Sequence, residues 1–344
     1  MPSLQADAQE MGAWALRDGV LTFTHRGRAF FWRMPAGYRM PHPALLELAE
    51  FLLLRKLGED LAPPATTRPA KGRKIAVAYS GGVDSTAAVR LLHRPLPIHT
   101  QVANPSRSHK LENALLALEE VGGIAIVTDS DEIPTLHDRR RGFFGKGAWT
   151  VPSVLLADHL NLGYVADGDV LETVYLHSAA GHGTKYNPHD HSALLERFRS
   201  AGLEYVMPCA GLTEVSTTEI ARGARYAMGC VRGVGGEPCR NCAKCYRKSA
   251  LGGSPIPIND EQQSRLEKDL IPMLPGLLWA RDHHGLSHPI LDAIEKDAAW
   301  AGGWYPPAIG YVPEPLRRRY LRRLRKLGIT PMSNPGAVET WISR

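Results

Sequence analysis

From Ile75 onward, short β-like apolar runs alternate with longer segments that carry apolar residues at helical spacing. This alternation constrains the fold most, because it is typical of repeated βαβ units with a parallel sheet. The predicted strands are Ile75 to Tyr79, Ile98 to Ala103, Ile124 to Thr128, Tyr164 to Ala166 and Tyr205 to Met207. The predicted helices are Ser85 to His93, Lys110 to Val121, Val154 to Leu162 and Ala193 to Ala201. We therefore expect an α/β fold with a doubly wound, parallel five-stranded sheet, whose ligands bind at the carboxyl ends of the strands.

Two further regions flank this α/β domain. Residues 13 to 33 hold short apolar stretches separated by glycine-containing turns, which predicts a small β-hairpin or meander. Leu45 to Leu57 forms a helical stripe before a proline-rich linker, and residues 260 to 344 have the pattern of helices broken by prolines. The predicted regions are a β-hairpin or meander with a helix and linker (1–70), the α/β domain with a cysteine cluster (71–252) and a helical C-terminal extension (253–344).

The first predicted strand of the α/β domain runs into a loop, Ser80 to Ser85, that reads Ser-Gly-Gly-Val-Asp-Ser. The glycines allow a sharp turn, and the N–H groups at the start of the following helix suit a phosphate. Ser80 and Ser85 add hydroxyl donors, and Asp84 is placed to hold a magnesium ion that bridges phosphate oxygens. A strand-to-helix turn whose Ser and Asp only cap the helix is the alternative, but the complete string in this context favours nucleotide binding.

Four of the five cysteines, Cys230, Cys239, Cys242 and Cys245, fall within sixteen residues and are separated by eight, two and two residues. In an intracellular chain such a cluster indicates a metal rather than disulfides. Four thiolates form a closed structural zinc site with no open position for catalysis. The alternative is a set of buried or redox cysteines unrelated to metal, and Cys209 stands apart from the cluster.

The loop string resembles the PP-loop of the N-type ATP pyrophosphatases, whose fold is adenine nucleotide α-hydrolase-like. This resemblance implies that the loop holds the pyrophosphate end of ATP with Mg²⁺. A substrate oxygen then attacks the α-phosphorus, and a nucleophile such as ammonia displaces AMP from the adenylate. The cysteine spacing, over about residues 73 to 252, further resembles 7-cyano-7-deazaguanine synthase. That resemblance implies an ATP-dependent ligase that adenylates a carboxylate, such as a 7-deazapurine acid, and transfers nitrogen to give an amide or nitrile.

The two resemblances assign roles to individual residues. The catalytic candidates are Asp84, Asp169 and Lys185. The residues placed at the nucleotide are Ala78, Tyr79, Ser80, Gly81, Gly82, Val83, Asp84, Ser85, Asn104 and Gly168, and the zinc ligands are Cys230, Cys239, Cys242 and Cys245. Asp167 and Asp169 follow the fourth predicted strand and are placed to bind Mg²⁺ with Asp84, although a helix cap and turn would look the same.

The chain departs from the synthase pattern at two places. The family's Val-Pro-Gly-Arg-Asn stretch is replaced by residues 151 to 155, Val-Pro-Ser-Val-Leu, so its Gly, Arg and Asn are missing. Glu214 stands where the family carries a lysine, so another cation has to take its place. Lys185, Lys146 and the Arg139 to Arg141 run are the candidates.

Two loops have more than one interpretation. The segment that contains Arg139 to Arg141 combines arginines, a lysine and glycines, as in a lid that closes on phosphates, but a solvated basic loop has the same composition. The histidines His177, His182, His189 and His191 crowd one stretch. Their spacings lack the helical pair with a third ligand that zinc sites use, so we interpret this stretch as a mobile active-site loop rather than a second metal site.

A net charge of +6 and a pI near 9.1 favour anionic partners, and ATP, an acidic small molecule and RNA all fit. The most basic segment, residues 317 to 326, has Leu316, Tyr320, Leu321 and Leu324 at helical spacing, so its arginines are predicted on the outer face of a packed helix. RNA or an acidic protein are the partners that face would suit. The chain is expected to be cytoplasmic and independent of membranes, because no run reaches 18 to 20 apolar residues and the start lacks a signal-like segment.

Three functions remain open from the residues. The first is the carboxylate-activating ligase, which takes a small acid and ammonia or another nitrogen donor. The second is a PP-loop enzyme that activates a tRNA base for sulfur insertion, with Cys209 as its thiol. The third is a nucleotide-sensing interaction module, and the pattern also leaves open whether the chain acts alone or as a homodimer.

Overall fold

The computed structural model of the chain describes residues 9–69, 72–105, 111–145, 147–176, 188–227, 230, 232–268 and 270–342. Lys146, Lys185, His177 and His182, which were singled out in the sequence, lie outside these ranges. The side chains of His189 and His191 are also outside the description.

In the described part of the chain, nine strands form one sheet in the order β1-β2-β3-β4-β7-β6-β5-β8-β9. Their bounds are Gln9–Met11 (β1), Trp14–Arg17 (β2), Val20–His25 (β3), Arg28–Arg33 (β4), Lys74–Ala78 (β5), Leu96–Val102 (β6), Ile124–Thr128 (β7), Leu162–Ala166 (β8) and Glu204–Val206 (β9). Strands β5 to β9 are parallel to one another, whereas β1 to β4 are antiparallel. The predicted five-stranded sheet is therefore too small, because β4 pairs with β7 at Trp32 and Thr128 and adds the N-terminal strands.

The N-terminal strands form a meander with one apolar face. Between β3 and β4, Arg26 and Gly27 both have positive φ, 49° and 77°, which is the backbone of a tight hairpin turn that matches the strand twist. Trp14 lies 4.7 Å from Phe23 and 5.4 Å from Trp32, measured between ring centroids, and all three rings are buried. These aromatic cross-strand pairs join the meander to the main core.

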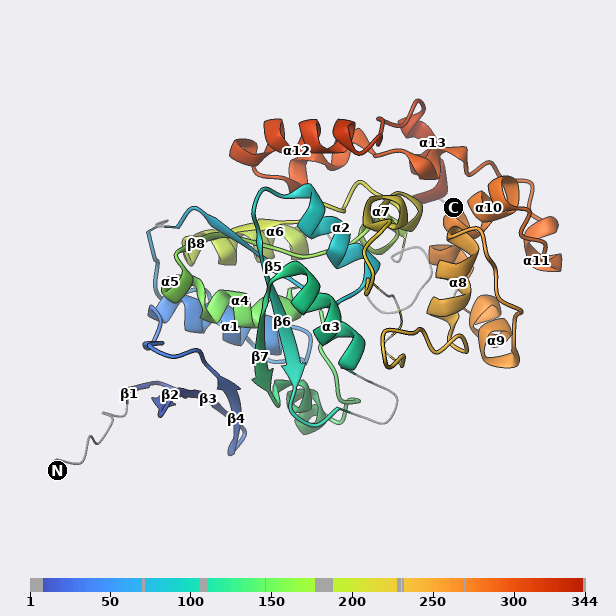
Figure 1. Ribbon diagram of the computed structural model, residues 1–344. Coiled ribbons are helices and arrows are strands. Elements are labelled where there is room, and N and C mark those ends of the chain that lie inside the picture. Colours follow the sequence, from blue (N-terminus) through green and yellow to red (C-terminus); the bar gives the residue numbers. More distant parts are fainter. Residues whose placement is uncertain are drawn as a thin grey trace.

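Helices cover both faces of the sheet (Figure 1). One layer holds α1 (Pro43–Leu54), α4 (Val151–Leu155), α5 (Ala157–Leu160) and α6 (Pro188–Ser200); the other holds α2 (Val83–Leu91), α3 (Glu112–Val121) and α7 (Glu214–Ala221). The single helix predicted over Val154 to Leu162 is wrong, since two short helices lie there and Leu162 already belongs to β8. Helix α5 ends at Asn161, whose φ of 56° is a left-handed cap.

The chain from Ala243 onward is largely helical in its described part. Its helices are α8 (Ala243–Leu251), α9 (Asp260–Lys268), α10 (Leu270–His284), α11 (Pro289–Asp292), α12 (Glu314–Lys326) and α13 (Pro335–Ile342). Helix α10 packs on α8, and α12 lies over α2 (Figure 1). The described residues also form 3-10 segments at Ser130–His137, Ala148–Thr150, Ala299–Gly302 and Pro306–Tyr311, and a π-type turn at Glu172–Leu176.

Helix α12 carries the basic segment. Tyr320 and Leu324 are buried, and the Tyr320 hydroxyl donates a hydrogen bond to the Pro208 carbonyl at 2.8 Å. The exposed side chains of the same helix include Arg318, Arg319 and Arg322, so the predicted outward arginine face is confirmed. Among the described helices, none combines the length and apolar character needed to cross a bilayer.

Candidate functional site

The loop Ser80 to Ser85 joins β5 to α2 and is closed by its own hydrogen bonds. The Ser80 N–H donates to Ser85 Oγ at 3.3 Å, the Ser85 hydroxyl donates to the Gly82 carbonyl at 3.0 Å, and the Gly82 N–H donates to Ser80 Oγ at 3.3 Å. Gly81 has φ of 72°, and a Cβ there would lie 2.6 Å from Ala114 Cα in α3. Only glycine fits this position, because both the backbone conformation and the space exclude a side chain.

Helix α2 begins next to the carboxyl edge of the parallel strands. Its N-cap residue, Gly82, offers no side chain to the first-turn N–H groups, so these donors are left for another acceptor. A Cβ on Gly168, which follows β8, would lie 2.8 Å from the Ser85 nitrogen. The turn after β8 and the loop after β5 are therefore in direct contact, which brings Gly168 to the loop.

Asp84, in the first turn of α2, is held from two sides. The Thr217 hydroxyl on α7 donates to its Oδ1 at 2.6 Å, and Nζ of Lys248 on α8 lies 3.5 Å from the same oxygen. The Asp84 side chain keeps about a third of its surface exposed, 32%. One carboxylate oxygen is thus oriented by the protein, and the group still reaches the outside.

Glu214 and two basic side chains form a charge cluster beside Asp84. Glu214 Oε2 lies 2.7 Å from Arg247 Nε and 3.5 Å from Lys248 Nζ. Burial alone would raise the pKa of Glu214, but Arg247 and Lys248 outweigh it and hold the pKa below its ordinary value. Lys248 therefore bridges Glu214 and Asp84. Neither of the predicted substitutes Lys185 and Lys146 lies in the described part of the chain.

A second acidic side chain, Glu172, is buried behind Glu214. Its Oε1 accepts a hydrogen bond from the Glu214 N–H at 3.0 Å, and its buried Oε2 has no hydrogen-bond partner among the described residues. Burial, and then the charges of Glu214 and Asp84, raise the pKa of Glu172 to about 8. Both causes favour the protonated form of Glu172.

The other acidic candidates lie near the same edge. The Tyr205 hydroxyl donates to Asp167 Oδ2, and the Asp169 N–H donates to Asp167 Oδ1 at 3.2 Å. Asp167 thus stabilises the turn that contains it, which is the structural alternative that the sequence left open. Asp169 is half-buried beside it. Asp84, Asp167 and Asp169 all lie close enough to Cys209 for their charges to raise the pKa of its thiol.

Cys209 is fully buried, at 0% exposure, and its Sγ lies 3.6 Å from the Asp84 carbonyl oxygen. Burial, and then the three neighbouring carboxylates, raise the pKa of this thiol well above its usual range. A buried thiol beside negative charges does not ionise readily, so the surroundings of Cys209 disfavour a nucleophilic role.

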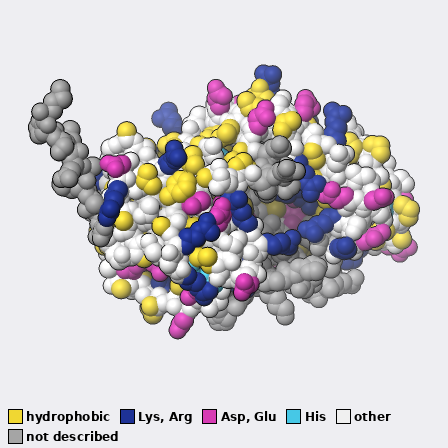
Figure 2. Space-filling view, turned by 90° about the horizontal axis from the view of Figure 1, so that it is seen from below, with side chains coloured by type: hydrophobic (Ala, Val, Ile, Leu, Met, Phe, Trp, Pro, Cys, Tyr) yellow, Lys and Arg dark blue, Asp and Glu magenta, His cyan; other side chains and the backbone are white. Residues whose placement is uncertain are grey.

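The remaining sequence candidates are spread over the carboxyl edge. Ala78 ends β5, and the Tyr79 side chain is buried, with its hydroxyl 3.0 Å from Thr86 Oγ1. Asn104 is exposed just past β6. Arg141, from the predicted lid, forms ion pairs with Asp131 and Glu132 instead of contacting the loop at any described atom. Figure 2 shows Lys and Arg side chains on both sides of a recess in the face seen from below.

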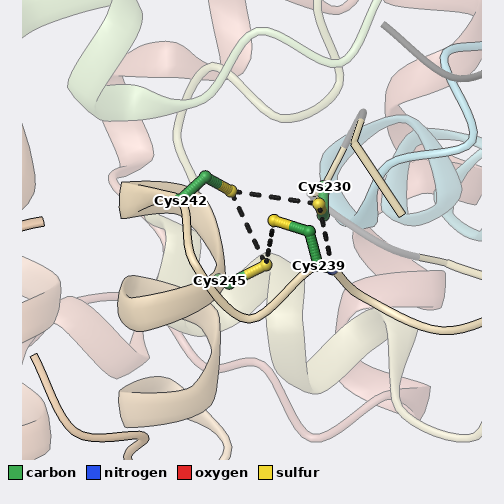
Figure 3. A group of neighbouring side chains, drawn as sticks. All are labelled: Cys230, Cys239, Cys242 and Cys245. Carbon is green, nitrogen blue, oxygen red and sulfur yellow. Dashed lines mark hydrogen bonds between the residues drawn. The ribbon is translucent and has the colours of Figure 1, made fainter. Parts of the chain in front are cut away.

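The four clustered cysteines converge from a loop and the start of α8 (Figure 3). Their sulfurs all lie within 4.8 Å of one another, and the closest pairs are 3.6 to 3.9 Å apart. Four sulfurs bonded tetrahedrally to one ion at about 2.3 Å would be about 3.8 Å apart. The predicted ligand set is therefore assembled at the right size for a single metal ion.

Sequence reasoning did not place Thr217, Arg247 or Lys248 at this site. Lys248 is three residues past Cys245 on α8. Because the cysteine cluster positions the start of that helix, the Lys248 side chain reaches Asp84. Thr217 lies one turn after Glu214 on α7, so the two side chains lie on the same face of that helix. The packing of α7 on α2 turns this face toward Asp84, and the sequence does not report that packing.

Residues 193–265 match a family of unknown function (DUF6395). No curated protein sequence matches the chain. Among solved structures, the U34-tRNA thiolase NcsA from Methanococcus maripaludis, with its [4Fe-4S] cluster, is similar at 13% identity and a TM-score of 0.32, over 78% of this chain and 89% of that one.

Proposed function

We propose that this chain is a PP-loop enzyme with a doubly wound nucleotide-binding sheet that binds ATP at Ser80 to Ser85 and splits it to AMP and pyrophosphate. The arrangement around Asp84 carries the proposal. A closed glycine loop, an uncapped helix N-terminus, an oriented carboxylate and the cation of Lys248 meet at the carboxyl end of β5. A polyphosphate with its metal ion needs this combination of donors and charges.

Each group has a defined task in the proposed reaction. The N–H groups of the loop and of the first turn of α2 bind the pyrophosphate, and Lys248 turns from its carboxylate partners to neutralise it as it leaves. Asp84 and Asp169 would hold Mg²⁺, which supplies charge neutralisation on the phosphate oxygens. Glu172 in its protonated form adds no negative charge to the site, so it does not repel the phosphates.

The resemblance of the loop and of the cysteine spacing to 7-cyano-7-deazaguanine synthase supports a carboxylate as the proposed substrate. A carboxylate oxygen attacks the α-phosphorus, the bond to pyrophosphate breaks, and an acyl adenylate forms. Ammonia, or another nitrogen donor, then attacks the acyl carbon, releases AMP and loses a proton to give an amide. A second activation would convert the amide to a nitrile. A 7-deazapurine acid is the first candidate for the substrate.

We propose that the cysteine cluster holds one Zn²⁺ as a structural ion. The sulfur spacing supports this choice, because a cluster of several irons needs more room between its thiolate ligands than one ion does. Elemental analysis of the purified protein is expected to give zinc and no acid-labile sulfide at this site. Iron with sulfide and visible absorption would show that the cysteines bind an iron–sulfur cluster instead.

The experiment for the proposed activity is product analysis. The protein is incubated with ATP, Mg²⁺, ammonium and a panel of carboxylic acids that includes 7-carboxy-7-deazaguanine. AMP is followed by chromatography and the product by mass spectrometry. Asp84→Asn is expected to abolish AMP formation, while Asp18→Asn, on an exposed turn between β2 and β3, is the matched control. Release of ADP and phosphate, or full activity of Asp84→Asn, would show that the proposed function is wrong.

A further inference from the structure

A second group of metal-ligand side chains lies away from the cysteines. His25 ends β3, His137 ends the 3-10 segment after β7, and Glu59 follows α1, yet their ligand atoms meet. His25 Nε2 lies 3.0 Å from His137 Nε2, and Glu59 Oε1 lies 3.7 Å from the first nitrogen and 3.6 Å from the second. Three segments remote in sequence therefore present two imidazoles and a carboxylate to one point.

These three distances fit the bond lengths of a zinc-like ion. A circle through the two Nε2 atoms and Oε1 has a radius of about 2.0 Å. Zn–N and Zn–O bonds are about 2.0 to 2.2 Å long, so one ion near the centre of this circle reaches all three atoms. An ion bonded to all three would sit less than about 1 Å from their plane, with a fourth position open. The two histidines and one carboxylate are also a ligand set that zinc uses in proteins.

The two imidazoles are positioned before any ion binds. The His25 and His137 rings stack at 12° to each other, with centroids 5.2 Å apart, and His25 also stacks on the Phe23 ring at 6.0 Å. The side chains of His25 and His137 are 12% and 5% exposed. Without an ion the facing Nε2 atoms must share one proton, since two N–H groups or two lone pairs would repel; an ion satisfies both lone pairs.

One cation already contacts the carboxylate. Arg26 donates to Glu59 Oε1 at 2.9 Å and to the Leu136 carbonyl at 2.9 Å. A carboxylate accepts up to about four bonds, so Arg26 and an ion bind the same group together. Arg26 is half-exposed, at 51%, and the neighbouring Arg28 is paired with Glu132, which limits the repulsion that an incoming ion meets.

We propose that His25, His137 and Glu59 bind a divalent transition-metal ion, best matched by Zn²⁺, at a site separate from the cysteine cluster. The ion fastens the β3–β4 hairpin and the segment after α1 to the segment that follows β7. This cross-link strengthens a junction where β4 and β7 share a single residue pair, Trp32 and Thr128. The proposal does not depend on the proposed ATP chemistry.

Metal counting tests the second site. The protein loaded with Zn²⁺ and then freed of excess ion is expected to hold two zinc ions per chain, and His25→Ala and His137→Ala are each expected to hold one. The exposed His93→Ala is the matched control and is expected to keep two. The same zinc content in the unchanged protein and in both histidine variants would overturn the proposal.

A conservative variant and a spectroscopic reading guard against unfolding of the alanine variants. Glu59→Gln keeps the size and an acceptor for Arg26, and is expected to weaken Zn²⁺ binding at this site at least 10-fold in a competition with a coloured chelator. In the protein loaded with ¹¹³Cd, nuclear magnetic resonance is expected to show one thiolate-bound ion and one ion with nitrogen and oxygen ligands. A single thiolate-type signal, or unchanged affinity in Glu59→Gln, would refute the second site.

Discussion

Replacing Lys248 by Met removes the cation that bridges the loop to the charge cluster. Lys248 Nζ lies 3.5 Å from Asp84 Oδ1 and 3.5 Å from Glu214 Oε2. At an effective dielectric constant of about 20, each of these pairs has a Coulomb energy of about 5 kcal/mol before desolvation is subtracted. The net loss is much smaller, because Asp84 is 32% exposed and Arg247 stays 2.7 Å from Glu214. We expect the free energy of unfolding to fall by roughly 1–2 kcal/mol.

The same substitution separates a structural role of Lys248 from a role in binding. If Lys248 turns to the pyrophosphate, Lys248→Met is expected to lower the affinity for Mg²⁺-ATP on the order of 10- to 100-fold, or about 1.4–2.8 kcal/mol. Urea unfolding measures the stability, and titration calorimetry measures the affinity. Lys244→Met, on the exposed side of the same helix, is the control and is expected to change neither quantity appreciably. An unchanged ATP affinity in Lys248→Met would refute this reasoning, whatever its stability.

Three further variants probe the surrounding residues. Gly81→Ala is expected to lower the free energy of unfolding in urea more than Gly27→Ala does. Both positions need a positive φ, but only the Cβ at Gly81 would meet backbone, 2.6 Å from Ala114 Cα. Equal losses of stability would contradict this clash. Glu172 has a folded pKa of about 8, above the ordinary 4.5, so the folded state binds the extra proton between these values and stability falls as pH rises through that window. Glu172→Gln is therefore expected to match the unchanged protein in melting temperature at pH 5 and to exceed it at pH 9, whereas a constant difference would argue against a protonated Glu172. Cys209→Ser is expected to keep full turnover, and its inactivation would favour sulfur transfer.

Local periodicity predicted the secondary structure of the α/β domain well. The predicted strand Ile124 to Thr128 coincides with β7, and the other four predicted strands overlap β5, β6, β8 and β9. A pattern of period two or 3.6 reports which side chains face a core, but it does not report which strands pair. The contact between Trp32 in β4 and Thr128 in β7, almost a hundred residues apart, therefore had no signature in the sequence.

The candidate site shows the same difference between what a local sequence pattern predicts and what only tertiary packing brings together. The loop from Ser80 to Ser85 was visible because its chemistry lies in consecutive residues, and so was the cysteine spacing. The cation opposite Asp84 was not, since Lys248 is 164 residues further along and reaches the loop only through the packing of α8. His25 and His137 were likewise invisible as a pair, because a hairpin turn and the end of a 3-10 segment bring them together.

Competition between ATP and pyrophosphate for the loop is the most direct test of the central claim. Titration calorimetry with Mg²⁺-ATP is expected to show one site per chain, and saturating Mg²⁺-pyrophosphate is expected to abolish the signal, because both ligands use the same N–H groups and Asp84. Asp84→Asn is expected to bind neither ligand measurably, while Asp18→Asn binds both. If ATP binds equally well in the presence of pyrophosphate, or equally well to Asp84→Asn, Ser80 to Ser85 is not the pyrophosphate site.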